Sequence, residues 1–334
     1  MSFSNLRDQW FPPTPAFLEG NVPSQAGKVL MVTGGNSGVG FELCKMLYGK
    51  GAVIYMACRS KERAERAIRT IKDTFPDEKT PSQLKFLEID LNDLKSVKTA
   101  AATFARQEAK LDILWNNAGT GANNITPGTR TKQDFEAMIG MHCIATLLFT
   151  QLLVPQLRAA ATSSSSPGST RVIWTASFMI EIGTPENGID FSLLSKGTLD
   201  GNRNYSVSKL GSWLLSREFA RLHGAEGIVS VAQNPGNLKT DVYDGTPWYM
   251  MFFVNWVLHD AKYGAYTELF AGLSPDLGLG EGNGKYVIPW GRIRGDEECP
   301  RKDIIKAITS VEDGGLGYDK KFWRWCEGQY KPFV

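Results

Sequence analysis

The chain has 334 residues, of which 42% are hydrophobic and 22% are charged. That composition is typical of a folded globular protein and excludes a disordered chain. The 37 lysines and arginines nearly balance the 35 acids, so the formal net charge is only +2. A balance this close to zero offers no basic footprint for nucleic acid and no polybasic membrane anchor.

Cysteine and histidine usage also restricts the function. The five cysteines are scattered and form no C-x-x-C pair, which argues against a disulfide framework or a zinc site and indicates a reducing compartment. The three histidines lack metal-ligand spacing, so no metal site is predicted. Residues 1–27 lack the basic-then-apolar order of a signal peptide, and the apolar run 248–258 is too short to span a bilayer. We therefore expect a cytoplasmic protein without a transmembrane segment.

The predicted elements alternate along the chain. An apolar run at 28–33 predicts a buried parallel strand, and helical spacing of apolar residues follows over 41–48. Further strand-like runs lie at 52–57, 84–89, 111–115, 171–175, 228–232 and 285–288, and amphipathic helix candidates lie at 61–73, 93–108, 134–157 and 207–223. Strands that alternate with helices predict an α/β fold with a doubly wound, mostly parallel sheet of seven strands.

This alternation continues without an interdomain linker, which predicts one domain over 28–290. An N-terminal extension, 1–27, precedes it and a C-terminal extension, 291–334, follows it. The serine-rich stretch 162–169 is interpreted as a surface loop. Aromatic residues at 322–325 predict a helix that packs back over the domain or over the substrate entrance.

A glycine-rich turn lies between the first strand and the first helix. It reads Thr33-Gly34-Gly35-Asn36-Ser37-Gly38-Val39-Gly40. Glycines at this place allow a tight turn and a close approach of the backbone to a pyrophosphate, whose charge the helix N-terminus meets. The turn therefore predicts a dinucleotide site.

The end of the second strand indicates which dinucleotide binds. An acidic residue about 20 residues beyond the glycines is expected for NAD, but Arg59 stands there. A guanidinium suits a 2′-phosphate through charge-assisted hydrogen bonds, so NADP(H) is predicted. The alternative is that Arg59 is a solvated charge at the start of a helix.

Tyr205 and Lys209 are four residues apart and share one face of a predicted helix. A free phenol has a pKa of about 10, and a nearby ammonium lowers it toward the range of general acid–base catalysis. Ser177 follows the fifth strand and reaches the same crevice, where its hydroxyl could bind a substrate oxygen. Alternatively, the first two residues are a surface pair and the serine is a strand-end cap.

Together these residues resemble the short-chain dehydrogenase/reductase family over about 28–289. The motifs are Thr33-Gly34-x3-Gly38-x-Gly40, Asp90-Leu91, Asn116-Asn117-Ala118-Gly119, Ser177, Tyr205-x3-Lys209, and Asn234-Pro235-Gly236 with Thr240. The Ala57-Cys58-Arg59 ending and the long stretch between Ser177 and Tyr205 are most similar to the retinol-dehydrogenase-like members and their fungal relatives.

The resemblance implies a Rossmann fold, a homodimer or homotetramer, and roles for the motif residues. Tyr205 would be the proton donor in reduction, Lys209 would lower its pKa and hold the nicotinamide ribose, and Ser177 would orient the substrate carbonyl. Further cofactor contacts would come from Asp90 and Leu91 at the adenine, from Asn117, Ala118 and Gly119 along the cleft, and from Pro235, Gly236, Leu238 and Thr240 near the carboxamide.

His142 departs from the family pattern, in which an asparagine at this place helps to anchor a water molecule of the proton relay. An imidazole can also hold a water molecule or titrate itself, so His142 is a catalytic candidate. The alternative is a hydrogen-bonded core histidine without a chemical role.

Two segments, 178–204 and 241–260, are predicted to wall the substrate pocket. The second is rich in aromatic residues and methionine, which favours a bulky apolar ligand; packing on the core, or a contact with a membrane surface or a subunit, is the alternative. The sequence therefore predicts an NADPH-dependent oxidoreductase that interconverts a ketone or aldehyde and an alcohol on a medium-sized, largely apolar small molecule of secondary or lipid metabolism. The alternatives are a catalytically silent NADP(H)-binding sensor or scaffold, and a non-redox enzyme on the same fold.

Overall fold

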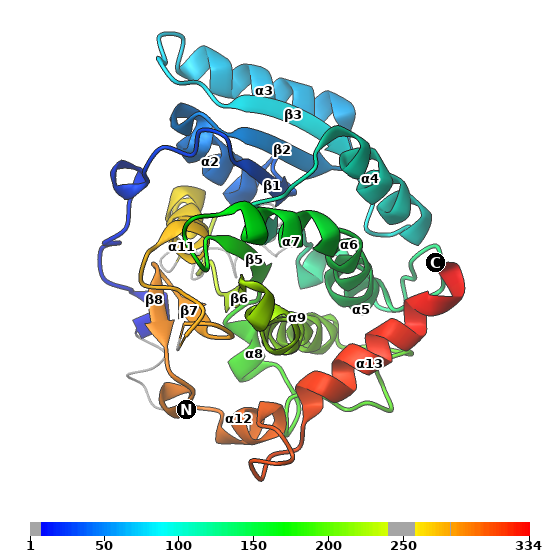
Figure 1. Cartoon of the computed structure of the whole chain (residues 1–334). Coiled ribbons are helices and arrows are strands. Elements are labelled where there is room, and N and C mark those ends of the chain that lie inside the picture. The colour runs from blue at the N-terminus through cyan, green and yellow to red at the C-terminus, as the bar shows by residue number, and fades with distance from the viewer. Residues whose placement is uncertain (1–7, 240–257, 281) are drawn as a thin grey trace.

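The computed structural model describes residues 8–239, 258–280 and 282–334. Its centre is an eight-stranded sheet in the order β3-β2-β1-β4-β5-β6-β7-β8, with helices on both faces (Figure 1). All neighbouring strands are parallel except β7 and β8, which are antiparallel. This arrangement confirms the predicted doubly wound, mostly parallel α/β fold.

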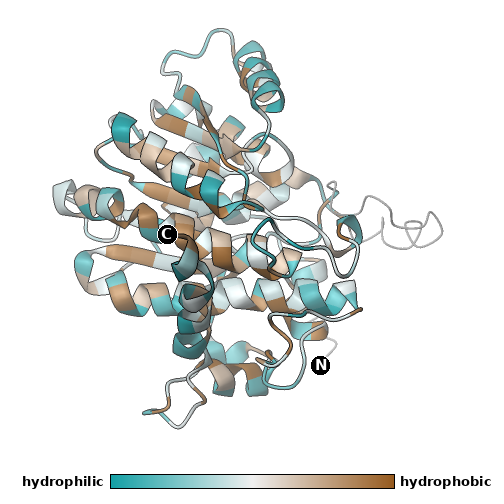
Figure 2. Ribbon diagram, turned by 90° about the vertical axis from the view of Figure 1, so that its right-hand side faces the viewer, coloured by the Kyte–Doolittle hydropathy of each residue, from teal (hydrophilic) through white to brown (hydrophobic). Residues whose placement is uncertain are grey.

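The strands lie close to their predicted places. They are β1 (Val29–Thr33), β2 (Val53–Cys58), β3 (Gln83–Glu88), β4 (Ile113–Asn116), β5 (Thr170–Thr175), β6 (Ile228–Gln233), β7 (Tyr286–Ile288) and β8 (Arg292–Arg294). The central strands β1, β4, β5 and β6 are buried along their whole length, as expected where helices cover both faces. Figure 2 shows the hydrophobic colour along these inner strands and the hydrophilic colour on outer helices.

Helices cover both faces of the sheet, and α12 and α13 pack farther out, with α13 against α9 and α6. They are α2 (Gly38–Leu47), α3 (Lys61–Thr74), α4 (Leu94–Gln107), α5 (Ala137–Ile139), α6 (Thr146–Leu152), α7 (Val154–Ser163), α8 (Met179–Ile182), α9 (Gly201–His223), α11 (Ala261–Leu273), α12 (Lys302–Ile308) and α13 (Tyr318–Tyr330). Because alternate strand residues point to opposite faces, Met31 packs in the apolar cluster with α4, α6 and α9, whereas Leu30 packs with α2 and α11.

The eighth strand was not predicted. β8 has only three residues, Arg-Ile-Arg, and its charged ends give no apolar run to detect. It pairs with β7 after a turn at Gly291, whose φ of 82° favours glycine. Arg294 is nevertheless buried, since Glu181 neutralises its charge.

The continuous helix predicted over 134–157 is broken in the structure. α5 leads into a π-helical segment, Gly140–Ala145, and then into α6. The Thr146 hydroxyl donates to the Met141 carbonyl, five residues earlier, at 2.9 Å. The chain then bends before α7, because Pro155 has no N–H and its ring would clash with the carbonyl of the preceding turn.

The helix predicted around 322–325 is α13, which packs against α9, α6 and the π-helical segment. Phe322, Trp323 and Cys326 are buried in this contact. Within the described ranges, no single helix has the length and apolarity of a membrane span; the helices at 137–152 and 154–163, bent by 52°, pass that test only as a pair.

Candidate active site

The candidate site is a cleft of about 720 Å³ at the carboxyl ends of the parallel strands, where ligands bind in such sheets. It extends from Arg59, after β2, to Tyr205 and Lys209 on α9. Seventeen of the predicted site residues line it: Gly34, Asn36, Ser37, Gly38, Val39, Arg59, Asp90, Leu91, Asn117, Ala118, Gly119, Ser177, Tyr205, Lys209, Pro235, Gly236 and Leu238. One cleft thus joins residues from seven separate stretches of the sequence.

The glycine-rich turn has the backbone that the sequence predicted. Gly34 and Gly38 have φ values of 70° and 54°, a region that favours glycine. Thr33 is buried below the turn rather than in the cleft wall, and its hydroxyl accepts the Ala118 N–H at 2.9 Å. Asn117 donates to the Thr33 carbonyl at 2.8 Å. The turn after β1 is therefore tied to the loop after β4.

Gly40 also lies beneath the turn, and its role can be tested. A Cβ at this position would come within 2.6 Å of both Asn117 Nδ2 and the Gly34 carbonyl oxygen. We expect Gly40→Ala to lower the free energy of unfolding by about 1–3 kcal/mol through overpacking, measured by urea denaturation. Gly278→Ala is the matched control, because no atom lies within 4 Å of its added Cβ. Equal stability of the two variants would contradict this packing role.

The far end of the cleft carries two arginines. Arg59 and Arg63 both line it, and both are exposed. Ser60 caps α3 between them by accepting the Arg63 N–H at 3.3 Å. Asp90, whose carboxylate accepts the Asn92 N–H at 3.0 Å, also lines the cleft. The glycine turn, the N-terminus of α2 and this polar end fit the pyrophosphate and the adenosine end of a dinucleotide.

The other end of the cleft brings together Ser177, Tyr205 and Lys209. The Lys209 Nζ lies 5.7 Å from the centroid of the Tyr205 ring and donates to the Thr175 carbonyl at 3.1 Å. Lys209 is only 5% exposed, and this burial lowers the pKa of its ammonium to about 8. Ser177 stands at the turn after β5, where its Oγ accepts the Met179 N–H at 3.2 Å. A phenol, an ammonium and a hydroxyl can together bind and protonate an oxygen.

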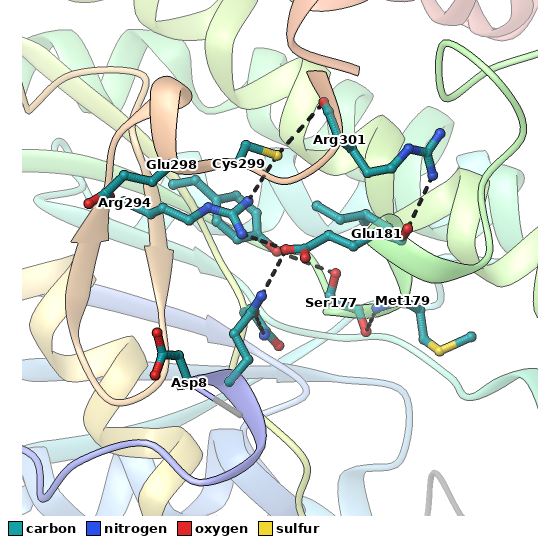
Figure 3. Close-up of polar contacts among 12 residues, drawn as sticks. Asp8, Ser177, Met179, Glu181, Arg294, Glu298, Cys299 and Arg301 are labelled. Carbon is teal, nitrogen blue, oxygen red and sulfur yellow. Dashed lines mark hydrogen bonds and ion pairs between the residues drawn. The ribbon is translucent and has the colours of Figure 1, made fainter. Parts of the chain in front are cut away.

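A buried polar network supports the turn that carries Ser177 (Figure 3). Glu181, on α8, accepts from Arg294 at 2.5 Å and from Gln9 at 2.8 Å. The Gln9 side-chain oxygen in turn accepts from Asn234 at 2.9 Å. Figure 3 shows Arg294 and Glu181 pointing toward each other beside Ser177. Residues from the N-terminal extension, α8, β8 and the turn after β6 therefore meet behind the catalytic end.

This network was missed by the sequence reasoning, since its partners are far apart in the chain. Gln9 and Glu181 are separated by 172 positions, and Gln9 and Asn234 by 225. No local pattern distinguishes these residues from surface polar residues. The Tyr286 hydroxyl, which donates to the Ser177 carbonyl at 3.3 Å, was missed for the same reason.

His142 is buried next to the site but does not line the cleft. The Ser208 hydroxyl donates to the Tyr205 carbonyl at 2.7 Å, so its oxygen is placed to accept a hydrogen bond from His142 Nδ1–H at 2.8 Å. His142 Nε2 then accepts the Thr120 N–H at 3.1 Å. Both ring nitrogens are thereby engaged, and this geometry favours the hydrogen-bonded core histidine over a relay group.

Burial, with a smaller contribution from the Lys209 charge, lowers the pKa of His142 well below its usual 6.5. Between that lowered pKa and 6.5, the unfolded imidazole binds a proton that the folded one does not. The free energy of unfolding should therefore fall as the pH drops, by up to about 1.4 kcal/mol per pH unit. We expect His142→Gln to show a flatter dependence in urea denaturation between pH 5 and 7.5, and parallel curves would contradict a buried neutral His142.

Of the two segments predicted to wall the substrate pocket, the structure describes 178–204 in full and 241–260 only from residue 258. Thr240 and residues 241–257 of the segment 241–260 lie outside the described residues. From the segment 178–204, Phe178, Met179 and Asn202 line the cleft. None of the described cleft-lining residues belongs to α13, so that helix packs on the domain and not over this cleft. Among residues 8–239, 258–280 and 282–334, no group of three or more His, Cys, Asp or Glu is placed to hold a metal ion.

Two solved structures have a similar fold. A protein from Mycobacterium paratuberculosis is 25% identical, with a TM-score of 0.66 over 94% of this chain and 97% of that one. The NADPH-bound carbonyl reductase from chicken fatty liver is 21% identical, with a TM-score of 0.58 over 82% of this chain and 100% of that one. The latter likeness supports the fold alone.

Sequence comparison finds relatives that match the whole chain. The family model described as short chain dehydrogenase matches residues 28–187. A Pestalotiopsis fici protein named short-chain dehydrogenase/reductase iacJ is 46% identical, over 100% of this chain and 99% of that protein. A Phomopsis amygdali protein named short-chain dehydrogenase/reductase is 41% identical, again over 100% and 99%. With its sheet, glycine turn and Ser-Tyr-Lys cleft, the chain belongs to the short-chain dehydrogenase/reductase family.

Proposed function

We propose that this protein is an NADPH-dependent oxidoreductase that interconverts a ketone or aldehyde and an alcohol. One observation carries the proposal: a single cleft has two arginines at one end and Ser177, Tyr205 and Lys209 at the other. The glycine turn and the loop after β4 line the cleft between these two ends. A dinucleotide lying along the cleft would have its adenosine end at the arginines and its nicotinamide beside Tyr205.

The preference for NADPH rests on charge. Arg59 occupies the place where an acid would bind an unmodified ribose, and Arg63 adds a second guanidinium to the lining of the cleft. Guanidinium groups bind phosphate oxygens through charge-assisted hydrogen bonds. A 2′-phosphate at this end would therefore be attracted, whereas NADH offers these side chains no anionic group.

The catalytic end supplies the proton and orients the substrate. A bound dihydronicotinamide supplies the hydride. In reduction, Tyr205 donates its hydroxyl proton to the carbonyl oxygen as the carbon becomes tetrahedral, and the Lys209 ammonium stabilises the resulting phenolate. The Ser177 hydroxyl donates a hydrogen bond to the same substrate oxygen. In the reverse direction, the phenolate takes the alcohol proton.

The substrate is proposed to be a medium-sized and largely apolar molecule. Around Ser177 and Tyr205, the cleft wall includes Met141, Phe178 and Met179. Aromatic and methionine side chains bind apolar groups, and methionine adapts to irregular shapes. Ketones or aldehydes of secondary or lipid metabolism fit this chemistry, and we propose that class.

The proposal is tested by titrating the purified protein with NADPH and NADH, following fluorescence. We expect wild type to prefer NADPH, and Arg59→Asp to weaken NADPH binding by about 10- to 150-fold, which corresponds to the loss of a hydrogen bond to a charged group. NADH binding should change little. Lys61→Asp is the matched control, because it makes the same charge change two residues away on a side chain outside the cleft.

Binding of neither nucleotide would contradict the enzyme proposal. A silent sensor or scaffold predicts tight binding without NADPH oxidation when carbonyl compounds are added. A non-redox enzyme predicts substrate conversion without a change in nicotinamide absorbance. The presence of Ser177, Tyr205 and Lys209 in one cleft favours redox turnover over both alternatives.

A further inference from the structure

A fully buried carboxyl lies in the core near the catalytic end. Glu268, on α11, is 0% exposed. Its Oε1 accepts from the Thr175 hydroxyl at 2.8 Å and from Gln233 Nε2 at 2.7 Å. Its Oε2 is also buried and has no hydrogen-bond partner among the described residues. Burying a carboxyl oxygen without a hydrogen-bond partner costs free energy, so we expect this carboxyl to have a role beyond packing.

Thr175 joins this carboxyl to Lys209. Its side chain donates to Glu268, and its carbonyl accepts from the Lys209 Nζ at 3.1 Å. Both ionisable groups are almost completely buried. Burial raises the pKa of Glu268 to about 7 and lowers the pKa of Lys209 to about 8, and the charge of each opposes the shift of the other.

The other charged groups near α11 have partners of their own. On α2, Lys45 pairs with Glu42 at 3.1 Å, and on β5, Arg171 donates to the carbonyls of Ala271 and Ser274. Among the described elements in main contact with α11, α2 also carries Cys44 and β7 carries Tyr286, and on α11 itself Lys262 pairs with Glu19 at 3.4 Å. In the described part of the chain, Lys209 is the charged group that acts on Glu268.

Among the described residues, the two titratable side chains of the π-helical segment near Lys209 do not supply a negative charge. His142 has both ring nitrogens engaged in hydrogen bonds. The Cys143 thiol donates to the Ser208 carbonyl at 3.1 Å, and burial raises its pKa far above neutrality. Glu268 is therefore the buried acid available to compensate the ammonium.

We propose that Glu268 is a positioning residue that acts through Lys209: it is the buried counter-charge, connected through Thr175, that keeps the lysine ammonium charged beside Tyr205. A buried charge without compensation is strongly disfavoured, so the ammonium would lose its proton at lower pH without this carboxylate. The effect on turnover rests on the proposed function, whereas the coupling of the two charges is a property of the protein alone.

The first test measures that coupling without cofactor or substrate. Lysine labelled with ¹³C at Cε is titrated by NMR, and the Lys209 resonance is assigned by its absence from Lys209→Met. We expect the Lys209 midpoint to fall by about one pH unit or more in Glu268→Gln. Glu268→Asp, which keeps the charge, should remain closer to wild type. Glu136→Gln is the matched control, because it removes another buried carboxyl whose pKa burial raises.

The coupling must also be visible from the other partner, because it is reciprocal. Burial raises the pKa of Glu268 to about 7, and in ¹³C-glutamate spectra we expect the Glu268 carboxyl to titrate at higher pH in Lys209→Met than in wild type. This measurement does not depend on the folding of Glu268→Gln. An unchanged Lys209 midpoint in Glu268→Gln, or an unchanged Glu268 midpoint in Lys209→Met, would overturn the proposal.

The pH profile of turnover then connects the coupling to catalysis. In Glu268→Gln, the alkaline limb of kcat for carbonyl reduction should move to lower pH by about the shift of the Lys209 midpoint. A role in packing alone would lower stability and leave the limb in place. If wild type oxidises no NADPH with any carbonyl, the proposed function fails, while the NMR result still decides the role of Glu268.

Discussion

Tyr205→Phe is expected to reduce kcat for carbonyl reduction by about 10²- to 10⁴-fold, which is the usual contribution of a positioned proton donor. The phenylalanine ring keeps the aromatic surface that lines the cleft, but it has no hydroxyl to protonate the substrate oxygen. NADPH affinity should therefore change little. The measurement is the initial rate of NADPH oxidation with a saturating carbonyl substrate, together with a fluorescence titration of the nucleotide.

A tyrosine outside the cleft provides the control. Tyr318, on α13, contacts Phe191 at 5.0 Å between ring centroids and does not line the cleft. Tyr318→Phe should keep wild-type kcat. If Tyr205→Phe retained more than about a tenth of the wild-type rate, Tyr205 would not be the proton donor.

Arg294→Met is expected to lower the free energy of unfolding by about 3–5 kcal/mol, which is a larger loss than that expected for Gly40→Ala. Arg294 and Glu181 are only 6% and 1% exposed in their side chains and form a hydrogen-bonded pair. Removing the guanidinium leaves the Glu181 carboxylate buried without its counter-charge. Urea denaturation at neutral pH measures the loss.

The matched control is an exposed pair. Arg158 and Glu226 also form short hydrogen bonds, but their side chains are 51% and 34% exposed. Arg158→Met should change the stability by about 0–1 kcal/mol. The double variant Glu181→Met with Arg294→Met should recover part of the loss, because it removes both charges. A cost in Arg294→Met no larger than in Arg158→Met would mean that the buried pair does not stabilise the fold.

Most of the sheet and the glycine turn could be predicted, because local physical rules determine them. The run at 28–33 is apolar because both faces of β1 are covered, and the positive φ angles of Gly34 and Gly38 explain the glycines there. The ends of parallel strands meet at one edge, so the order of the motifs also predicted that Arg59, Ser177 and Tyr205 would line one cleft.

The features that the sequence could not predict depend on tertiary contacts. The π-helical segment at Gly140–Ala145 has ordinary helical periodicity, and only the structure shows how it aligns His142 with Thr120. Glu268 lies in a mostly buried helix and has no local signal, because its partners Thr175 and Gln233 come from the strands β5 and β6. Such polar residues acquire a role only when distant segments fold together.

Gln9 has a practical consequence for work with shortened or hybrid proteins. Its side chain bridges Glu181, near Ser177, and Asn234, next to Pro235, although the family match begins only at residue 28. A version trimmed to that start would lose the amide that connects the turn after β5 to the turn after β6. Exchanges of N-terminal segments between relatives would therefore change the support behind Ser177 and Pro235 while leaving every described residue of the cleft wall in place.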